Sequence, residues 1–471
     1  MADDALVATG LFWFARDKVP RGRFAPDSAV PGQLTISDEG RIDLRLDGLL
    51  SRPNKRQKAA TDGDASAIQG YLVQANKYCL LLDAFESGVH LAGSGASTET
   101  FRAFAAFVGD KRIDYKTSGL RFSSAEFELA GYSDWFSSNR LKIKPTKRSF
   151  SLRYVSPNTS EYDAPWGKVE VIRYLKCDTS FEEGNRNLNA SERATILARY
   201  HEPLTYKEVL RNVGLIRDLL VVLSNSARRG TFATLKLAGQ KATYVLYHQR
   251  LAGEKFQKNS PPWTTFAEVA GTFGDLIFRW ASASQAYGPG VYLYLGTRRG
   301  FDLFEEHRLV NLIWGLETLH RRKNPEKAVN APTIERMNRI FAAVSDARDR
   351  KWLKWRLRYA SEVPLEERLF QLLSPLPFDL DQARLKAFCK ACAQYRNNMS
   401  HHGGVRADED YTKALHAWND HSAALDVFYH ILLLVEIAVE PQIIERVIKR
   451  STQYRWYFER VELIESRSAS A

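Results

Sequence analysis

The N-terminal part of the chain alternates between apolar and polar positions, as strands with one buried face do. The alternation over residues 34–36 stops at a turn over 38–40, which ends in glycine, and resumes over 42–46. A period of two on both sides of a turn predicts a β-hairpin. Apolar segments at 71–85 and 122–129 predict further strands, so we expect a β-rich, sandwich-like region with a few helices.

The middle of the chain mixes two patterns. Apolar side chains at three- and four-residue spacing predict helices over 206–224 and 266–282, and short apolar runs predict strands at 169–175, 244–247 and 291–295. From residue 301 onward the helical spacing continues throughout. It predicts helices over 331–359, 364–373, 381–402 and 408–440 and an amphipathic piece from Pro441.

These patterns predict an α+β multidomain protein. We expect a β-rich domain at 1–150, a mixed α/β lobe at 151–300 and an all-α bundle at 301–471. Apolar residues make up 44% of the chain and charged residues 26%, which is ordinary for a globular protein. The acidic start and the short apolar run at 431–439 fit neither a signal segment nor a membrane span, so we expect a cytoplasmic protein with no membrane partner.

The net charge of +12 is unevenly distributed. The first 300 residues contain 41 Lys and Arg against 31 Asp and Glu, and the rest contains 26 against 24. Attraction for polyanions is therefore expected mainly in the N-terminal part. Cys389 and Cys392 form a C-x-x-C on one predicted helix face without a second ligand pair, which favours buried structural thiols over a metal or redox site.

The segment YRNNMSHHGG, residues 395–404, carries the candidate chemistry. On the predicted helix Arg396 falls near the centre of a narrow apolar stripe, where a guanidinium needs an anion, another helix or a partner subunit. Gly403 suits a left-handed cap, so His401 and His402 occupy the last turn. The carbonyls at a helix end favour the imidazolium form, which suits proton transfer near neutral pH.

These residue types match the needs of RNA cleavage by its own 2′-hydroxyl. The reaction needs removal of one proton, delivery of another to the leaving 5′-oxygen and stabilisation of the extra negative charge on phosphorus. A histidine can serve the first two needs and Arg396 the third, while Asn397 can hold the phosphate or orient the imidazole. No metal or other cofactor is required.

The spacing from Arg396 through Asn397 and Ser400 to His401 resembles the Arg, four to six residues, His signature of HEPN (higher eukaryotes and prokaryotes nucleotide-binding) domains. The segments WGLETLHRR (314–322) and PLEERLFQLL (364–373) precede it in a similar order. With GQLTISDEGRIDLRLDGLL (32–50), LLDAF (81–85) and YSDWF (132–136), nearly the whole chain resembles the ApeA family of bacterial antiphage proteins.

The resemblance implies a metal-independent HEPN endoribonuclease that acts as a homodimer, with its Arg and His sets facing each other across the interface. It also implies abortive infection, in which host RNA is cut before the phage matures. We expect a substrate such as tRNA or another single-stranded loop, cleaved to a 2′,3′-cyclic phosphate and a 5′-hydroxyl, and a phage-derived trigger at the N-terminal region. The alternative is a non-catalytic HEPN protein that binds RNA or nucleotide as a sensor or scaffold.

Several assignments stay open from the residues alone. His401 and His402 lie about 140° and 120° from Arg396 on opposite sides of the helix, and the commoner family spacing favours His401. Glu317 is a predicted buried carboxylate that either orients the site or forms an internal salt bridge, and Tyr395 either stacks on a base or packs in the core. The basic cluster comprises Lys351, Lys354, Arg356 and Arg358. It either guides RNA phosphates or forms a solvated face, and the tryptophans interspersed with it, Trp352 and Trp355, have core spacing.

Overall fold

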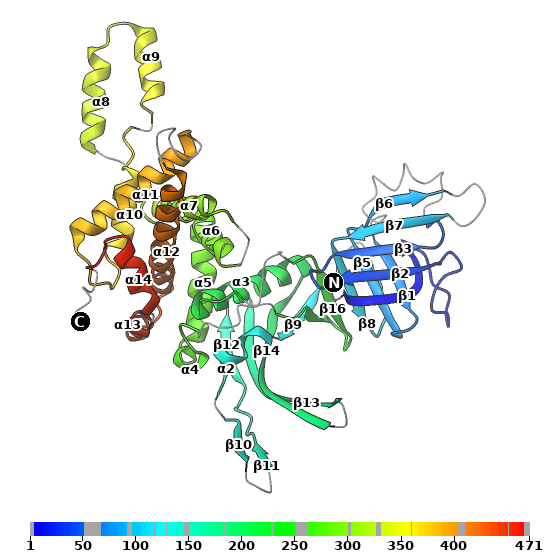
Figure 1. The fold of residues 1–471 in the computed structure, drawn as a ribbon. Coiled ribbons are helices and arrows are strands. Elements are labelled where there is room, and N and C mark those ends of the chain that lie inside the picture. Colours follow the sequence, from blue (N-terminus) through cyan, green and yellow to red (C-terminus); the bar gives the residue numbers. More distant parts are fainter. Residues whose placement is uncertain are drawn as a thin grey trace. The chain divides into compact units, whose positions relative to one another are not determined.

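The computed structural model describes most of the chain, and Figure 1 shows its fold. The residues outside this description are 1–3, 51–66, 92–96, 116–118, 129, 139, 146–149, 183–184, 228–229, 251–261, 300–302, 326–330, 359, 403–409, 451 and 466–471. The chain forms two compact units. Unit 1 comprises Met1–Ile216 and Arg228–Phe256, and unit 2 comprises Arg217–Ala227 and Gln257–Ala471. The domain boundaries at 150 and 300 stay predictions.

Unit 1 is built on a 14-stranded antiparallel sheet with the order β12-β13-β14-β9-β15-β16-β8-β5-β4-β1-β2-β3-β7-β6. In chain order its strands are β1 (Asp4–Phe14), β2 (Val30–Ser37), β3 (Ile42–Leu46), β4 (Ile68–Leu72), β5 (Lys77–Leu82), β6 (Phe85–His90), β7 (Thr98–Ala103), β8 (Ala105–Gly109), β9 (Phe122–Glu128), β12 (Ser160–Ala164), β13 (Gly167–Glu182), β14 (Asn185–Leu204), β15 (Ala233–Leu237) and β16 (Thr243–His248). A second sheet pairs β10 (Lys142–Pro145) with β11 (Phe150–Arg153), and two short helices are η3 (Ala130–Tyr132) and α2 (Ser133–Phe136). The prediction of a β-rich N-terminal region is confirmed.

The predicted hairpin is formed by β2 and β3. Ile36 pairs with Ile42 and Leu34 with Leu44, and all four side chains are buried in the core of the sheet. Gly40 in the turn has a φ of 78°, a left-handed conformation that glycine adopts without a steric penalty. The alternation in the sequence thus corresponds directly to one buried face.

Unit 2 is helical. Its helices after α3 (Tyr206–Ser224), whose last residues belong to this unit, are α4 (Phe266–Val269), α5 (Phe273–Tyr287), α6 (Pro289–Arg298), α7 (Glu305–Lys323), α8 (Ala331–Ala343), α9 (Ala347–Arg356), α10 (Leu365–Leu373), α11 (Gln382–His402), α12 (Tyr411–Glu436), α13 (Pro441–Arg450) and α14 (Thr452–Arg460). Helix α7 packs against α6, α10, α11 and α12. The side chains of α12 are buried on all sides over 424–434, so α7 and α12 form the centre of the bundle.

Three helix and strand predictions were wrong. Residues 291–295 lie in α6 and not in a strand, because Gly288 ends α5 and Pro289 begins a new helix at its first position. The predicted helix over 266–282 is divided into α4 and α5. The predicted helix over 331–359 is divided into α8 and α9, because Asp346 accepts hydrogen bonds from two backbone amides and begins α9 as an N-cap.

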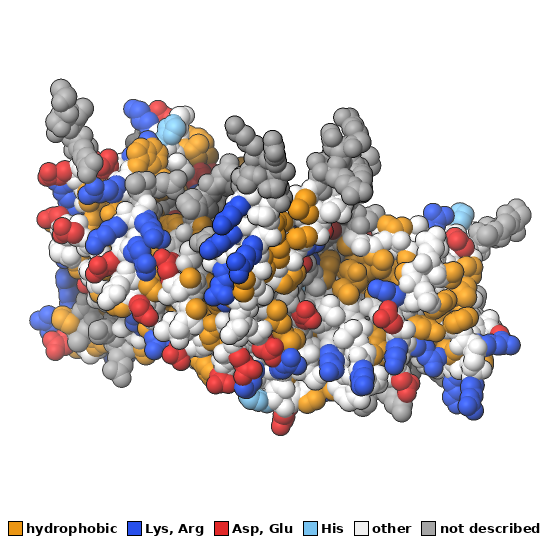
Figure 2. Space-filling model, turned by 90° about the horizontal axis from the view of Figure 1, so that it is seen from below, with side chains coloured by type: hydrophobic (Ala, Val, Ile, Leu, Met, Phe, Trp, Pro, Cys, Tyr) orange, Lys and Arg blue, Asp and Glu red, His pale blue; other side chains and the backbone are white. Residues whose placement is uncertain are grey.

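The molecular surface is mixed in character. Figure 2 shows basic and acidic side chains interspersed with hydrophobic ones on the face that it draws. Among the described residues, no helix combines the length and the apolar character needed to cross a bilayer. Because charges of both signs are mixed on this face, their distribution does not indicate a binding site. The candidate site is instead defined by contacts between side chains.

Candidate functional site

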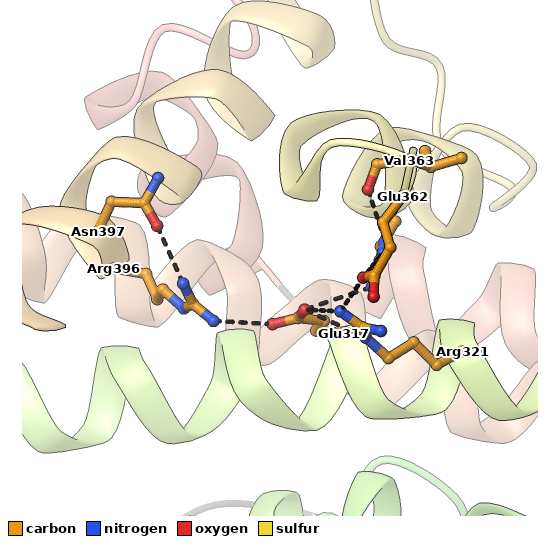
Figure 3. A network of polar contacts seen from close by, with 7 residues as sticks. Glu317, Arg321, Glu362, Val363, Arg396 and Asn397 are labelled. Carbon is orange, nitrogen blue, oxygen red and sulfur yellow. Dashed lines mark hydrogen bonds and ion pairs between the residues drawn. The ribbon is translucent and has the colours of Figure 1, made fainter. Parts of the chain in front are cut away.

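The site is centred on an ion pair between α11 and α7, drawn in Figure 3. Nη2 of Arg396 donates a hydrogen bond to Glu317 Oε2 at 3.2 Å, and Nη1 donates to Asn397 Oδ1 at 3.0 Å. The Arg396 side chain is 25% exposed, and its Nε is buried without an acceptor among the described residues. Glu317 on the neighbouring helix is thus the anion that the apolar stripe around Arg396 requires.

Glu317 also holds two further arginines. Its Oε1 accepts hydrogen bonds from Arg321 Nη2 at 3.0 Å and from Arg368 Nη1 at 3.3 Å. Oε2 of Glu362 lies 2.7 Å from Arg368 Nη2 and 2.5 Å from Arg321 Nη2. We call these four residues, together with Arg396, the Glu317 cluster. Three arginines share two carboxylates, so the cluster has one net positive charge. One of the three guanidinium groups, that of Arg396, is partly exposed.

Arg368 is the most buried member of the Glu317 cluster. Its side chain is 2% exposed, and besides both carboxylates it binds the Val363 carbonyl oxygen through Nε at 2.8 Å. Burial by itself would raise the pKa of Glu362, but hydrogen bonds from Arg321 and Arg368 outweigh it and hold that pKa below its usual value. The carboxylate therefore stays charged at neutral pH and fixes both arginines.

Packing on α12 orients the helix that carries Arg396. Phe388 stacks on His421 with ring centroids 5.2 Å apart, and Tyr395 meets the same imidazole edge-on at 4.9 Å. Burial lowers the pKa of His421, so the ring is neutral at pH 7 and acts as an aromatic packing surface. Of the two roles left open for Tyr395, this contact favours packing.

The remaining motif residues lie on the last turns of α11. Asn397 and Ser400 are exposed, and the described part of α11 extends to His402. Gly403 lies outside the described residues, so its role as the cap of this helix stays a prediction. The side chains of His401 and His402 lie outside the described residues. Because a helix rises about 1.5 Å per residue, their backbones are about 7.5 Å and 9 Å along the axis from Arg396. The assignment of the chemistry to His401 stays a prediction.

The predicted basic cluster lies on a different helix from the motif. Lys351, Lys354 and Arg356 are on α9, Arg358 follows it, and all four are exposed. The tryptophans between them are exposed too, so the core packing indicated by their spacing was wrong.

Sequence reasoning missed Arg321, Glu362 and Arg368. The signal for Arg368 was present, because its position one turn before Leu372 puts it on the apolar face of α10. A buried arginine requires carboxylate partners, but the helical period of α10 says nothing about which residues of other segments supply them.

The C-x-x-C is buried in the bundle. Cys389 and Cys392 are buried, free thiols, as predicted, and burial raises the pKa of Cys389 to about 12. Such a thiol is protonated and unreactive at neutral pH. Among the described residues, no group of His, Cys, Asp and Glu side chains is arranged to hold a metal ion.

Two family models match the chain. Residues 8–227 match ApeA N-terminal domain 1, and residues 310–442 match the Apea-like HEPN domain. The second match includes Glu317, Arg396 and His401. No curated protein and no solved structure matches the chain significantly.

Proposed function

The chain belongs to the ApeA-type antiphage-defence proteins with a C-terminal HEPN domain, and we propose that this domain is a metal-independent endoribonuclease. The observation that supports the proposal best is the partly exposed Arg396, held by Glu317 in a cluster with one net positive charge. The same helix ends with two histidines, which are the side chains suited to proton transfer near neutral pH.

The reaction is an in-line displacement at phosphorus. A neutral histidine takes the proton of the RNA 2′-hydroxyl, and the 2′-oxygen attacks the adjacent phosphorus. The bond from phosphorus to the 5′-oxygen breaks, and that oxygen takes a proton from an imidazolium. The products are a 2′,3′-cyclic phosphate and a 5′-hydroxyl. We assign the proton transfers to His401, with His402 as the alternative position.

Arg396 stabilises the charge that develops on the phosphoryl oxygens. Its guanidinium is always protonated and presents several N–H donors in one plane, which suits a phosphate that becomes more negative in the transition state. Glu317 is a positioning residue, because it binds Arg396 through Oε2 and is itself fixed by Arg321 and Arg368. Asn397 contributes a neutral amide next to the phosphate.

The active form is a homodimer through the HEPN domain. On one helix Arg396 and His401 lie about 140° apart, so a single copy directs them to different sides. Two copies facing each other would let the arginine of one and the histidine of the other reach the same phosphate. In that case, mixing Arg396→Ala and His401→Ala proteins should partly restore cleavage that each lacks alone.

The substrate is host RNA, with tRNA or another single-stranded loop as the preferred target, because an unpaired ribose can adopt the in-line geometry. Cutting this RNA stops growth before the phage matures. The N-terminal region, which carries most of the net positive charge, receives a phage-derived trigger and restrains the nuclease until then.

The test compares cells that express the wild type, Arg396→Ala, His401→Ala and His402→Ala, with Arg384→Ala as a matched control. Arg384 is on the same helix and forms an exposed ion pair with Glu465. We expect the Arg396 variant and one histidine variant to lose phage protection together with RNA cleavage, and the control to retain both. The ends of the cut RNA should be 2′,3′-cyclic phosphates, and purified protein should cut RNA in chelator.

The rival function, RNA or nucleotide binding by a non-catalytic HEPN protein, makes the opposite prediction. Phage protection would then survive the loss of either histidine, and infected cells would contain no RNA cut in a manner that depends on Arg396. Cleavage that stops in chelator would instead contradict the metal-independent mechanism.

A further inference from the structure

The paired helices α8 and α9 present an exposed aromatic and basic surface in unit 2. In Figure 1 they lie side by side and away from the other helices of the bundle. No residue of α9 is buried, and Trp352 and Trp355 are 58% and 56% exposed. Two large aromatic side chains on a helix without a buried face indicate that a ligand covers them.

The two faces of α9 differ in character. The half-buried residues Arg350, Leu353 and Leu357 lie on one side, next to Lys354, whose amine lies over Phe341 of α8. By helical angle Trp352 and Trp355 are on the opposite side, within about 140° of arc that also holds Arg348, Lys351 and Arg356. Asp346 and Asp349 lie outside this arc, and Asp346 is occupied in capping α9.

Arginine side chains already lie against the exposed indoles. The guanidinium carbon of Arg356 is 5.7 Å from the ring centre of Trp352 and 5.3 Å from that of Trp355. Arg358 lies 5.3 Å from the Trp355 ring. Cations and flat rings thus alternate along one face, which is the arrangement that binds phosphates and stacks bases of a single strand.

The charge of this region is concentrated in the helix pair. Residues 331–358 contain eight Lys and Arg against three Asp and Glu, while the rest of residues 301–471 contains 18 against 21. Contact between two such hairpins in a symmetric dimer would bring like charges together, because a two-fold axis pairs a patch with itself. A polyanion is therefore the better complement.

We infer that the face of α9 formed by Arg348, Lys351, Trp352, Trp355 and Arg356 binds single-stranded RNA. This inference rests on the proposed ribonuclease function, because it assigns the surface to the substrate of that reaction. The indoles stack on unpaired bases while the cations neutralise phosphates, so the hairpin selects loops over duplex. Lys354 contributes less, because its amine lies over Phe341 of α8.

The test measures binding of a fluorescent single-stranded oligoribonucleotide and of a duplex of equal length to the full chain carrying His401→Ala and His402→Ala, which prevents cleavage. The variant is Trp352→Ala with Trp355→Ala. Its control is Trp456→Ala, since Trp456 is 53% exposed on α14 and also lies under an arginine, with Arg460 at 4.8 Å. We expect the double variant to weaken single-strand binding at least about 25-fold, and the control to leave it unchanged.

A second variant removes charge and keeps the rings. Arg348→Ala with Lys351→Ala should lower the slope of log affinity against log salt by about 1.4, since each neutralised phosphate of a single strand contributes about 0.7. Lys449→Ala, an exposed lysine on α13, is its control. This slope is measurable even if the tryptophan variant were to lose its helix pair.

Unchanged single-strand affinity in the tryptophan variant would overturn the inference. If that variant instead changed the sedimentation of the protein and left RNA binding intact, the face would be a contact between copies of the chain. Failure of this inference can be distinguished from failure of the proposed nuclease function. Binding is measured without cleavage, and cleavage that persists with an altered hairpin would contradict only the inference about α9.

Discussion

Helix α7 takes part in two clusters of arginines and carboxylates, the Glu317 cluster in its second half and another near its start. The second, which we call the Asp426 cluster, consists of Asp426, Arg298, Arg308, Tyr294 and His430. Asp426 Oδ2 lies 2.7 Å from Arg298 Nη2 and 3.6 Å from Arg308 Nη2. The Tyr294 hydroxyl accepts a hydrogen bond from Arg298 Nε and shares another with His430 Nδ1.

The two clusters differ in the titratable groups that accompany their arginines and carboxylates. Tyr294 and His430 are fully buried. Burial raises the pKa of Tyr294 and lowers that of His430 well below its usual value, so neither group changes charge near neutral pH. In the Glu317 cluster the guanidinium of Arg396 is partly exposed, and two histidines follow at the end of its helix. Both clusters contain a partly exposed arginine, so the feature that sets the proposed reaction site apart is the pair of histidines, a side-chain type suited to proton exchange near neutral pH.

The largest expected effect is on the Asp426 cluster. Asp426→Ala leaves Arg298, whose side chain is 18% exposed, without its carboxylate, and leaves Arg308 with Glu305 alone. The free energy of unfolding should fall by about 3–5 kcal/mol, as measured by urea denaturation. RNA cleavage per folded molecule should be unchanged. If cleavage fell and stability did not, the functional distinction between the two clusters would be wrong.

The opposite result is expected for the Glu317 cluster. Arg396→Ala should lower the rate of RNA cleavage by about 10²–10³-fold, the loss typical of one removed donor to a developing oxyanion. Its free energy of unfolding should fall by about 1 kcal/mol or less, because Glu317 keeps Arg321 and Arg368 as partners and leaves no unpaired carboxylate. Single-turnover kinetics and urea denaturation of the same preparation measure both quantities.

A smaller effect separates positioning from chemistry within the Glu317 cluster. Glu317→Gln keeps the shape of the side chain but removes the charge that holds Arg396, so kcat should fall about tenfold with little change in KM. Arg321→Ala is the control, since it removes an exposed partner of Glu317 without touching Arg396. Equal losses in both variants would mean that Glu317 acts only through the stability of the bundle.

The smallest expected effect is the pH dependence of stability. In the folded chain, burial keeps His430 neutral, while in the unfolded chain its pKa is about 6.5. Below that pH the unfolded state binds a proton that the folded state does not, so stability falls by up to about 1.4 kcal/mol per pH unit. Urea denaturation between pH 7 and pH 5 measures this slope, which should be shallower in His430→Asn. An identical slope in that variant would contradict a buried, neutral imidazole.

Local patterns predicted local structure well. The alternation around Gly40 predicted the β2–β3 hairpin, and the spacing of apolar residues predicted α10. The strand at 291–295 failed because Val291, Tyr294 and Leu295 are buried on one face of α6, a spacing of three and four that a short apolar run conceals. The spacing of apolar residues identifies the buried face of a helix or strand, but a segment of only five residues is too short to distinguish the two.

For the candidate site, the sequence predicted the type of partner that Arg396 needs but not which residue supplies it. The apolar stripe around Arg396 indicated that an anion was needed, and Glu317 was recognised as a buried carboxylate, but their pairing joins residues 79 positions apart. Trp352 and Trp355 were misjudged for a related reason. Their spacing is compatible with a core, but no other element of the bundle supplies the covering surface.

The shared helix α3 has a consequence for how such proteins can exchange parts in evolution or engineering. Its last residues belong to the helical unit, where Asp218 pairs with Arg299 and the Leu223 carbonyl accepts a hydrogen bond from Thr264. The chain then returns to unit 1 before it completes unit 2. A single crossover cannot therefore transfer the whole helical unit between relatives, and a chimera joined after residue 227 would combine α3 of one parent with the bundle of another. Residues 217–227 and the segments that contact them around Thr264 and Arg299 should thus change together when either half is replaced.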